Sequence, residues 1–308
     1  MKIYVAGISG MVGSSVERAA ISRGHEAVGF PSTKVNFLDR SKTFESLKDT
    51  NPDALIIAAA KVGGIGANSK YPVEFLSSNV QIQSNLIDGA YAAGIKKVIF
   101  LGSSCIYPKL AAQPIAEDSL LTGPLESTNE PYAIAKIAGV KLIDAYRKEF
   151  GCDWISLMPT NLYGPGDSFN LEDSHVLPAL LRKIHEAKKA NHQEVVIWGD
   201  GSPLRELLFV DDLAAAIIDL LETSPKDSLI NIGSGEEVSI KTLAELISKT
   251  VGFQGTFTFD SSKPNGTPRK LLDSTRMSKT GWKPRVNLSE GIRITYDWFL
   301  NNETVAIR

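Results

Sequence analysis

The amino-acid sequence predicts an α/β protein, with a Rossmann-like doubly wound parallel sheet followed by a smaller mixed α/β C-terminal substrate domain. In the first half, short apolar runs alternate with amphipathic segments of helical length, which is typical of a parallel sheet covered by helices. Three closely spaced glycines follow the first run, where such folds turn from strand to helix. The 308 residues suffice for about two domains. We expect the first domain at residues 1–160 and the second mainly at 161–308, with some segments returning to the first.

The predicted elements follow from the apolar pattern. Parallel strands are expected at residues 2–7, 27–30, 55–60, 97–102 and 154–159. Between them, apolar positions recur every three or four residues, as in Leu86, Ile87 and Ala90, which is the spacing of one helix face. Beyond residue 159, proline and glycine separate shorter helical segments, predicted at 176–191, 211–223 and 240–251. This looser pattern indicates the second domain.

Composition excludes several classes of protein. Hydrophobic residues make up 43% and charged residues 22%, which is typical of a globular chain rather than a disordered one. The net charge of −2 gives no electrostatic reason to expect nucleic acid or an anionic membrane as a partner. No stretch approaches the roughly 18 apolar residues of a spanning helix. We therefore expect a cytoplasmic protein. Its two cysteines, Cys105 and Cys152, are too few for a disulfide framework. No metal site is expected.

A glycine-rich loop predicts a dinucleotide site. Gly7, Gly10 and Gly13 have the spacing G-x-x-G-x-x-G between the first strand and the first helix. Glycine allows a sharp turn and close approach of the backbone to a pyrophosphate, and the helix N-terminus offers free N–H groups. The intervening Ser9, Met11 and Val12 are therefore candidate cofactor contacts.

The end of the second strand favours NADP over NAD. NAD enzymes place a carboxylate there for the ribose 2′-hydroxyl, whereas this chain has Ser32, Thr33 and Lys34. We expect NADPH as the hydride donor, although Lys34 is read nearly as well as an ordinary solvated loop residue. Asp39 is placed to reach the adenine edge.

A Tyr-x-x-x-Lys pair predicts proton transfer at a hydroxyl or carbonyl group. Tyr132 and Lys136 lie one helical turn apart, and the lysine charge together with the positive nicotinamide ring is expected to favour the phenolate. Ser103 follows a strand whose carboxyl end faces the ligand side of such a sheet. We expect its hydroxyl to bind the same substrate oxygen.

The order of these motifs resembles the extended short-chain dehydrogenase/reductase superfamily, whose members act mostly on nucleotide sugars. Longer strings resemble one family within it, the GDP-L-fucose synthases, and the similarity runs essentially end to end. They are AAKVGGI at 59–65, GSSCIYP at 102–108, NEPYAIAK at 129–136, PTNLYGP at 159–165 and KPNGTPRK at 263–270. The resemblance implies NADPH-dependent conversion of GDP-4-keto-6-deoxy-D-mannose to GDP-L-fucose.

That reaction needs a base and an acid beside the sugar ring, because C3 and C5 are epimerised before C4 is reduced. The resemblance assigns these roles to Cys105 and His175. By residue type alone, Cys105 is read equally as a small core residue, and His175 as a residue that caps the following helix. Cys152 is expected to be structural.

The resemblance also implies ligand contacts and a homodimer formed by two helices from each subunit. The further cofactor contacts that it implies are Ala59, Lys136, Pro159, Asn161, Leu162 and His175. The GDP-sugar contacts are Ser104, Asn161, Lys183, Trp198, Arg205 and Lys270. The chain departs from the family at Lys183, where an arginine is usual, and at Ser9 and Ser32, which weakens the expected preference for NADP.

Other functions stay open at this stage. A 4-epimerase or a plain 4-reductase needs only Ser103, Tyr132 and Lys136. An enzyme acting on another GDP-4-keto sugar, a deoxysugar or a heptose, could use Cys105 and His175 in the same way. A non-catalytic dinucleotide-binding regulator is the alternative from another class, but such proteins commonly lose the Tyr-x-x-x-Lys pair, which this chain keeps.

Overall fold

In the computed structural model, which describes residues 1–171, 174–263 and 265–307, six strands form a parallel sheet in the order β2-β1-β3-β4-β5-β9. The strands are β1 (Lys2–Ala6), β2 (Glu26–Val28), β3 (Ala54–Ile57), β4 (Lys97–Leu101), β5 (Asp153–Pro159) and β9 (Leu229–Ile232). The predicted doubly wound fold is confirmed. Every predicted strand forms, with bounds that agree to within three residues. Most are buried on both faces, which explains their continuous apolar runs.

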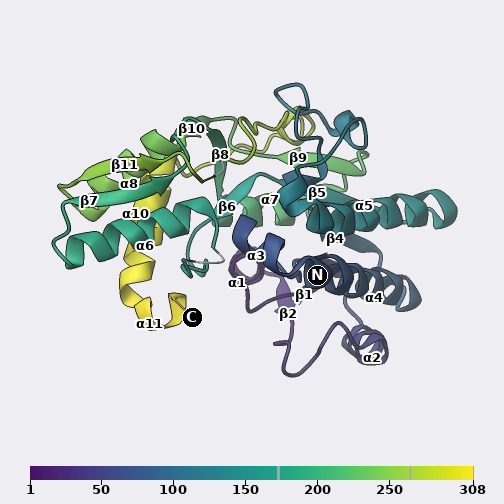
Figure 1. Cartoon of the computed structure of the whole chain (residues 1–308). Coiled ribbons are helices and arrows are strands. Elements are labelled where there is room, and N and C mark those ends of the chain that lie inside the picture. Colours follow the sequence, from purple (N-terminus) through teal and green to yellow (C-terminus); the bar gives the residue numbers. More distant parts are fainter. Residues whose placement is uncertain (172–173, 264, 308) are drawn as a thin grey trace.

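Helices cover both faces of this sheet (Figure 1). On one face α1 (Met11–Ser22) packs against α7 (Val210–Thr223), and residues such as Val16 and Ile217 meet the strands in one core. On the other face lie α2 (Arg40–Thr50), α4 (Asn79–Ala92) and α5 (Glu130–Phe150), with Leu86 and Val140 in a second core. The sheet is therefore protected from water on both sides.

The remaining strands belong to two smaller sheets beside a third core. One contains β6 (Asn161–Tyr163), β8 (Leu204–Phe209) and β10 (Glu237–Ser239), and the other contains β7 (Glu194–Trp198) and β11 (Thr256–Asp260). Helices α6 (Val176–Lys189), α8 (Ile240–Val251) and α10 (Leu288–Asn301) pack here. Short elements complete the described chain: α3 (Ile65–Lys70), the π-helix η1 (Glu74–Ser78), the 3₁₀ turns η2 (Ser104–Ile106), η3 (Glu117–Ser119) and η4 (Ser127–Asn129), α9 (Thr275–Ser278) and α11 (Glu303–Ala306).

Two late segments return to the first sheet. β9 pairs with β5 in parallel, and α7 packs on α1, although both follow residue 160. The division at residue 160 stays a prediction, but the structure shows that the sequence before it does not complete the large sheet. Across the residues described, no helix is both long and apolar enough to span a membrane.

Candidate active site

The glycine loop joins β1 to α1 through very close backbone contacts. Gly7 has φ +90°, and a Cβ there would lie 2.8 Å from the amide nitrogen of Ala59. A Cβ on Gly13 would lie 2.0 Å from the carbonyl oxygen of Gly7. Only glycine fits either position, so strand, loop and helix approach one another as a phosphate-binding turn requires.

The N-terminus of α1 fits a pyrophosphate. Gly10 is its N-cap, without a side-chain hydrogen bond, and its first turn carries no acidic residue. The first N–H groups and the positive end of the helix dipole thus remain available to an anion. A second loop packs against this turn, because a Cβ on Gly166 would lie 3.4 Å from the Cα of Met11. A dinucleotide is compatible with this arrangement.

Residues expected near the adenosine half lie on an exposed turn. Ser32, Thr33 and Lys34 are exposed, and the Lys34 ammonium lies 4.3 Å from the centroid of the Phe30 ring. Asp39 caps α2 by accepting a hydrogen bond from the Lys42 amide at 3.0 Å. A contact between Asp39 and adenine stays a prediction, since one carboxylate oxygen already has this structural role.

Ser103 and Tyr132 meet at the carboxyl end of β4. The Ser103 hydroxyl accepts a hydrogen bond from the Cys105 amide at 3.2 Å and is also hydrogen-bonded to Tyr132. Burial and the nearby Cys105 charge raise the pKa of Tyr132, and the Ser103 bond opposes this only in part. Burial by itself thus favours the protonated phenol, and a phenolate supported by Lys136 and the nicotinamide ring stays a prediction. A protonated phenol is the form that donates a proton when a ketone is reduced.

Lys136 lies beneath this pair. Its side chain is 3% exposed, and its ammonium donates a hydrogen bond to the Leu101 carbonyl at 2.8 Å. The same nitrogen lies 5.8 Å from the centroid of the Tyr132 ring. Burial lowers the pKa of Lys136 to about 7. Its charge therefore responds to small changes around it near neutral pH.

Cys105 lies among polar groups rather than in the apolar core. Its Sγ accepts hydrogen bonds from Asn129 Nδ2 at 3.2 Å and from Lys270 Nζ at 3.3 Å. Burial raises the pKa of the Cys105 thiol, but the Lys270 charge and the bonds from Ser103, Lys270 and Asn129 outweigh burial and lower it overall. The core-filler alternative does not fit these contacts. Cys152, in contrast, has a pKa raised chiefly by burial.

His175 lies within electrostatic reach of Lys270, which contacts the thiol. His175 is the N-cap of α6 but makes no side-chain cap bond, so its imidazole does not serve the helix. Burial of the imidazole and then the Lys270 charge lower the pKa of His175, although the residue as a whole is exposed. The Cys105 charge also acts on Arg205. The structure thus brings Cys105, His175, Arg205 and Lys270 together from four separate segments.

The outer part of the site has an aromatic platform. Trp198 is 58% exposed, with Lys183 Nζ 5.3 Å and Lys263 Nζ 5.6 Å from its ring. Arg205 donates to the Thr267 carbonyl at 2.7 Å, which ties it to the loop that carries Lys263. Asn161 donates to the Glu206 carbonyl at 3.1 Å.

Two residues at the site were not singled out from the sequence. Asn129 ends η4 and contacts the thiol, and a signal was present because it lies three residues before Tyr132 in the same motif. Phe75 lies on the π-helix η1, and its ring packs edge-on against the Tyr132 ring, with 6.2 Å between the ring centroids. No spacing in the sequence indicated that contact. The inner cavity is lined by Ser104, Cys105, Tyr107, Pro108, Lys109, Ile115, Glu126, Asn129, Thr267 and Lys270.

The parallel sheet, the glycine loop and the Ser-Tyr-Lys arrangement together define an extended short-chain dehydrogenase/reductase. The chain belongs to the NAD dependent epimerase/dehydratase family, whose model matches residues 3–233, and within it to the GDP-L-fucose synthase family. It is 54% identical over 303 residues to "Probable GDP-L-fucose synthase 1" of Oryza sativa subsp. japonica, covering 98% of this chain and 92% of the relative. Identity to the GDP-L-fucose synthase of Escherichia coli K12 is 49%, covering 98% and 97%.

A solved structure supports the same assignment. The NADP-bound GDP-L-fucose synthetase of Naegleria fowleri superposes with a TM-score of 0.90 at 28% identity, covering 100% of this chain and 96% of the other.

Proposed function

We propose that this chain converts GDP-4-keto-6-deoxy-D-mannose to GDP-L-fucose by 3,5-epimerisation followed by NADPH-dependent reduction at C4. Its relatives from rice and Escherichia coli are GDP-L-fucose synthases by name and match it over nearly their whole length. The observation that carries the proposal is the Cys105 thiol, which lies in the same site as Ser103 and Tyr132 and accepts a bond from Lys270. A simple reductase has no need of that thiol.

Epimerisation starts from the 4-keto group, which acidifies the hydrogens on C3 and C5. Cys105 as a thiolate removes such a proton, and His175 supplies one to the opposite face of the ring. The polar contacts to Cys105 Sγ favour the thiolate. The lowered pKa of His175 makes its imidazolium a stronger acid than an ordinary histidine.

Reduction uses the other pair. NADPH, when bound at the glycine loop, supplies the hydride to C4. Ser103 orients the ketone oxygen, and Tyr132 donates the proton that this oxygen requires. Lys136, directly behind the phenol, supports the phenolate that remains. Both parts of the reaction thus share one sugar position.

The nucleotide half of the substrate is proposed to bind at the aromatic platform. Trp198 offers an exposed ring for guanine, and the Lys183 and Lys263 ammoniums lie beside it. Arg205 is the candidate partner of the diphosphate, because guanidinium binds phosphate oxygens in pairs.

Product analysis by NMR tests this function. Enzyme, NADPH and GDP-4-keto-6-deoxy-D-mannose should give GDP-L-fucose as the main product. GDP-rhamnose would instead identify a 4-reductase without epimerase activity, and unreacted ketone would exclude both activities.

The role of Cys105 is tested by exchange in heavy water. Cys105→Ser should lose deuterium uptake at C3 and C5, because a hydroxyl is a much weaker base than a thiolate. Cys152→Ser is the matched control and should exchange like the unmodified enzyme. Unchanged uptake in Cys105→Ser would remove this thiol from the mechanism.

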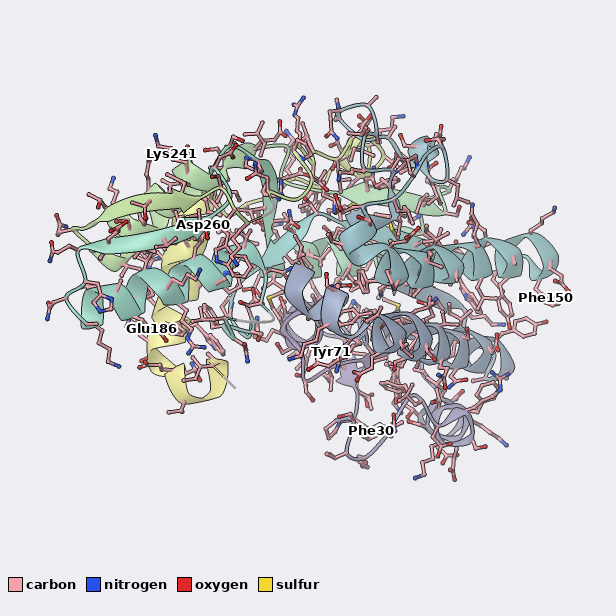
Figure 2. All side chains as sticks on the ribbon, in the orientation of Figure 1. Phe30, Tyr71, Phe150, Glu186, Lys241 and Asp260 are labelled. Carbon is pink, nitrogen blue, oxygen red and sulfur yellow. The ribbon has the colours of Figure 1, made fainter. Side chains whose placement is uncertain are left out.

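A homodimer is part of the proposal. Tyr91 of α4 and Ile134 and Phe150 of α5 are exposed, and Figure 2 shows Phe150 at the outer end of α5, where its ring packs on Tyr91. Apolar side chains on two packed helices suit a helix-to-helix interface. Light scattering should give a dimer for the whole chain and a monomer for Ile134→Glu, since burying a charge there is unfavourable. A dimer that survives this change would place the interface elsewhere.

We also infer a cytoplasmic location. Both cysteines are free thiols, as is usual in that compartment. Fractionation of cells that express the tagged protein would test this, and recovery in a secreted or membrane fraction would contradict it.

A further inference from the structure

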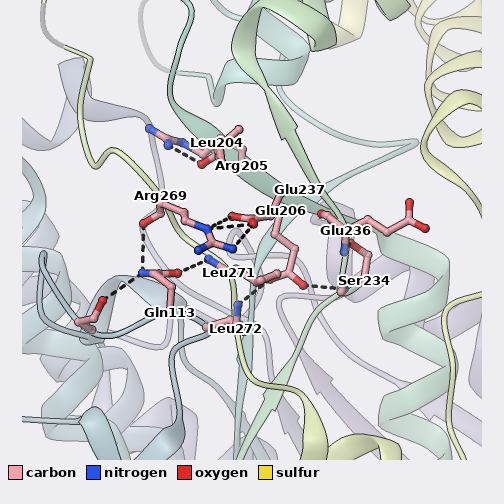
Figure 3. A network of polar contacts seen from close by, with 12 residues as sticks. Gln113, Leu204, Arg205, Glu206, Ser234, Glu236, Glu237, Arg269, Leu271 and Leu272 are labelled. Atoms are coloured by element: carbon pink, nitrogen blue, oxygen red, sulfur yellow. Dashed lines mark hydrogen bonds and ion pairs between the residues drawn. The ribbon is translucent and has the colours of Figure 1, made fainter.

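Residues 269–273 form an extended segment that is held from two sides. On one side, the Leu271 amide donates to Gln113 Oε1 at 2.9 Å, and the Leu271 carbonyl accepts from the Ile115 amide at 2.8 Å. On the other side, the Leu272 amide donates to Glu206 Oε2 at 3.1 Å. Figure 3 shows Gln113 and Glu206 flanking the segment. Lys270 therefore lies next to backbone that is fixed in place.

Glu206 is a fully buried carboxylate whose oxygens are both used. Oε2 binds Leu272, and Oε1 accepts from the Gly235 amide at 2.8 Å. A buried carboxylate is unfavourable unless it is hydrogen-bonded, so these two contacts explain how β8 retains the residue. Gly233 leaves room for it, because a Cβ there would lie 2.1 Å from Oε1.

Arg269, the first residue of the segment, is held in a different way. Arg269 forms a bidentate ion pair with Glu237 of β10, with Nη2 2.6 Å from Oε2 and Nε 2.9 Å from Oε1. This pair lies near the surface, where ion pairs contribute little. The buried Glu206 contact is thus the stronger candidate for holding the segment on this side.

The fixed segment directs Lys270 at the thiol. Lys270 Nζ lies 3.3 Å from Cys105 Sγ. The other groups that act on Cys105 are Ser103, Asn129, Tyr132 and Arg205, and His175 lies within reach of the Lys270 charge. Lys270 is the cation in direct contact with sulfur, so its ammonium favours the thiolate most strongly.

We propose that Lys270 is the catalytic residue that keeps Cys105 ionised, and that Glu206 is the positioning residue that aims it by holding the Leu272 amide. The resemblance to GDP-L-fucose synthases implied a substrate contact for Lys270, whereas the structure directs its ammonium at the catalytic thiol. This inference rests on the proposed function for the use of Cys105 as a base. The ionisation of the thiol is measurable without any substrate.

The test measures alkylation of Cys105 by iodoacetamide across pH in a Cys152→Ser background, where Cys105 is the single thiol. Lys270→Met should slow alkylation at neutral pH by about tenfold or more, which is the effect of removing an adjacent opposite charge. The pH midpoint of alkylation should move upward, since the thiolate loses its cation. Lys270→Arg keeps the charge and should restore most of the rate. An unchanged rate in Lys270→Met would overturn the inference.

Glu206→Gln tests the positioning role. The amide keeps the shape but presents a donor to one backbone N–H, so alkylation at neutral pH should slow toward the Lys270→Met rate. Adding Glu206→Gln to Lys270→Met should have no further effect, because the two residues act in series. Glu237→Gln is the matched control, since it breaks the Arg269 ion pair but leaves Leu272 bound. An equal effect of Glu237→Gln, or additive effects of the first pair, would overturn the role of Glu206.

A second variant and the product assay distinguish a folding defect and a failure of the proposed function from a failure of this inference. If Glu206→Gln fails to fold, Gly233→Ala displaces the same carboxylate while keeping its charge, and it should slow alkylation as well. If alkylation behaves as expected but no GDP-L-fucose forms, the proposed function fails while the lysine–thiol pair stands.

Discussion

Tyr132 and Lys136 show how burial sets the chemistry of single residues. The two lie one turn apart on α5, and burial moves both pKa values toward the neutral form, upward for the phenol and downward for the ammonium. The sequence pattern identified the pair, but not this effect, because residue spacing does not reveal how much water a helix face retains.

Tyr132→Phe tests the proton donor. Turnover, followed as NADPH oxidation with the 4-keto sugar, should fall by about 10²- to 10⁴-fold, because the ketone oxygen loses its acid. Deuterium uptake at C3 and C5 should persist, since Cys105 and His175 perform that exchange. Tyr71→Phe, on an exposed ring, should retain full turnover. Full activity in Tyr132→Phe would remove the phenol from the mechanism.

Lys136 should make stability depend on pH. Its pKa of about 7 in the folded chain lies below the roughly 10.4 of an unfolded lysine, so between these values the unfolded state binds more protons. Wild-type stability should therefore rise with pH from about 7 toward 10 relative to Lys136→Met, by an amount on the order of a few kcal/mol. Urea unfolding at pH 7 and pH 9.5 measures this difference.

The exposed Lys141 of the same helix supplies the control. Lys141→Met should show no such pH-dependent difference from wild type. If the unfolding free energies of wild type and Lys136→Met differ by the same amount at both pH values, burial does not bias the charge of Lys136.

At the scale of elements, the glycine loop was the most predictable part. Its spacing, position and role in joining β1 to α1 follow from local sequence, and the structure explains Gly7 and Gly13 by backbone contacts of 2.8 and 2.0 Å for an added Cβ. Short elements that depend on distant partners were not predicted. β9 has only four residues, and its place beside β5 is set by contacts far away in the chain.

Gly13→Ala should disrupt the strand-to-helix junction. Its methyl group would meet the Gly7 carbonyl, and overpacking against rigid backbone costs roughly 1–3 kcal/mol or more. We expect a lower melting temperature and loss of NADPH binding, measured by fluorescence titration. Gly10→Ala is the comparison, because its Cβ would lie 3.4 Å from the same oxygen and the melting temperature should change little. Equal effects of the two variants would contradict the steric argument.

In the site, too, residues in local motifs could be predicted from the sequence, whereas contacts between distant segments could not. Ser103, Cys105, Tyr132 and Lys136 were found because each lies in a recognisable string. The hold of Glu206 on Leu272 joins residues 66 positions apart through a backbone amide, which leaves no trace in side-chain pattern. Asn129 lies in the same string as Tyr132, but its role depends on η4, which places its amide on the thiol.

At the scale of the whole molecule, the first sheet depends on sequence that follows residue 160. Polar contacts as well as the apolar core join α1 and the residue after it to α7: Ser15 Oγ and Arg18 meet Asp211 at 2.5 and 2.7 Å, and Arg23 meets Asp219 at 2.8 Å. β9 covers the edge of β5. β9 and α7 therefore share cores with the first part of the chain, in keeping with the expectation that some later segments return to it.

A chain of residues 1–160 should consequently fail to fold. It would expose the apolar face of α1 that α7 covers, and it would leave β5 as an unpaired edge. Near-ultraviolet circular dichroism should show no fixed tertiary packing, and NADPH should not bind. The full chain measured in parallel is the control. A cooperative unfolding transition for the fragment would show that residues 1–160 are self-sufficient.

The pairing of β5 with β9 also sets a sequence of events during synthesis. The glycine loop, Ser103 and the Tyr-Lys pair are synthesised before the edge strand β9. Residues 229–232 come roughly seventy positions after β5. Until then, the edge of β5 and the apolar face of α1 are uncovered. We therefore expect NADPH to bind the growing chain only after β9 has emerged, at residue 232 of 308.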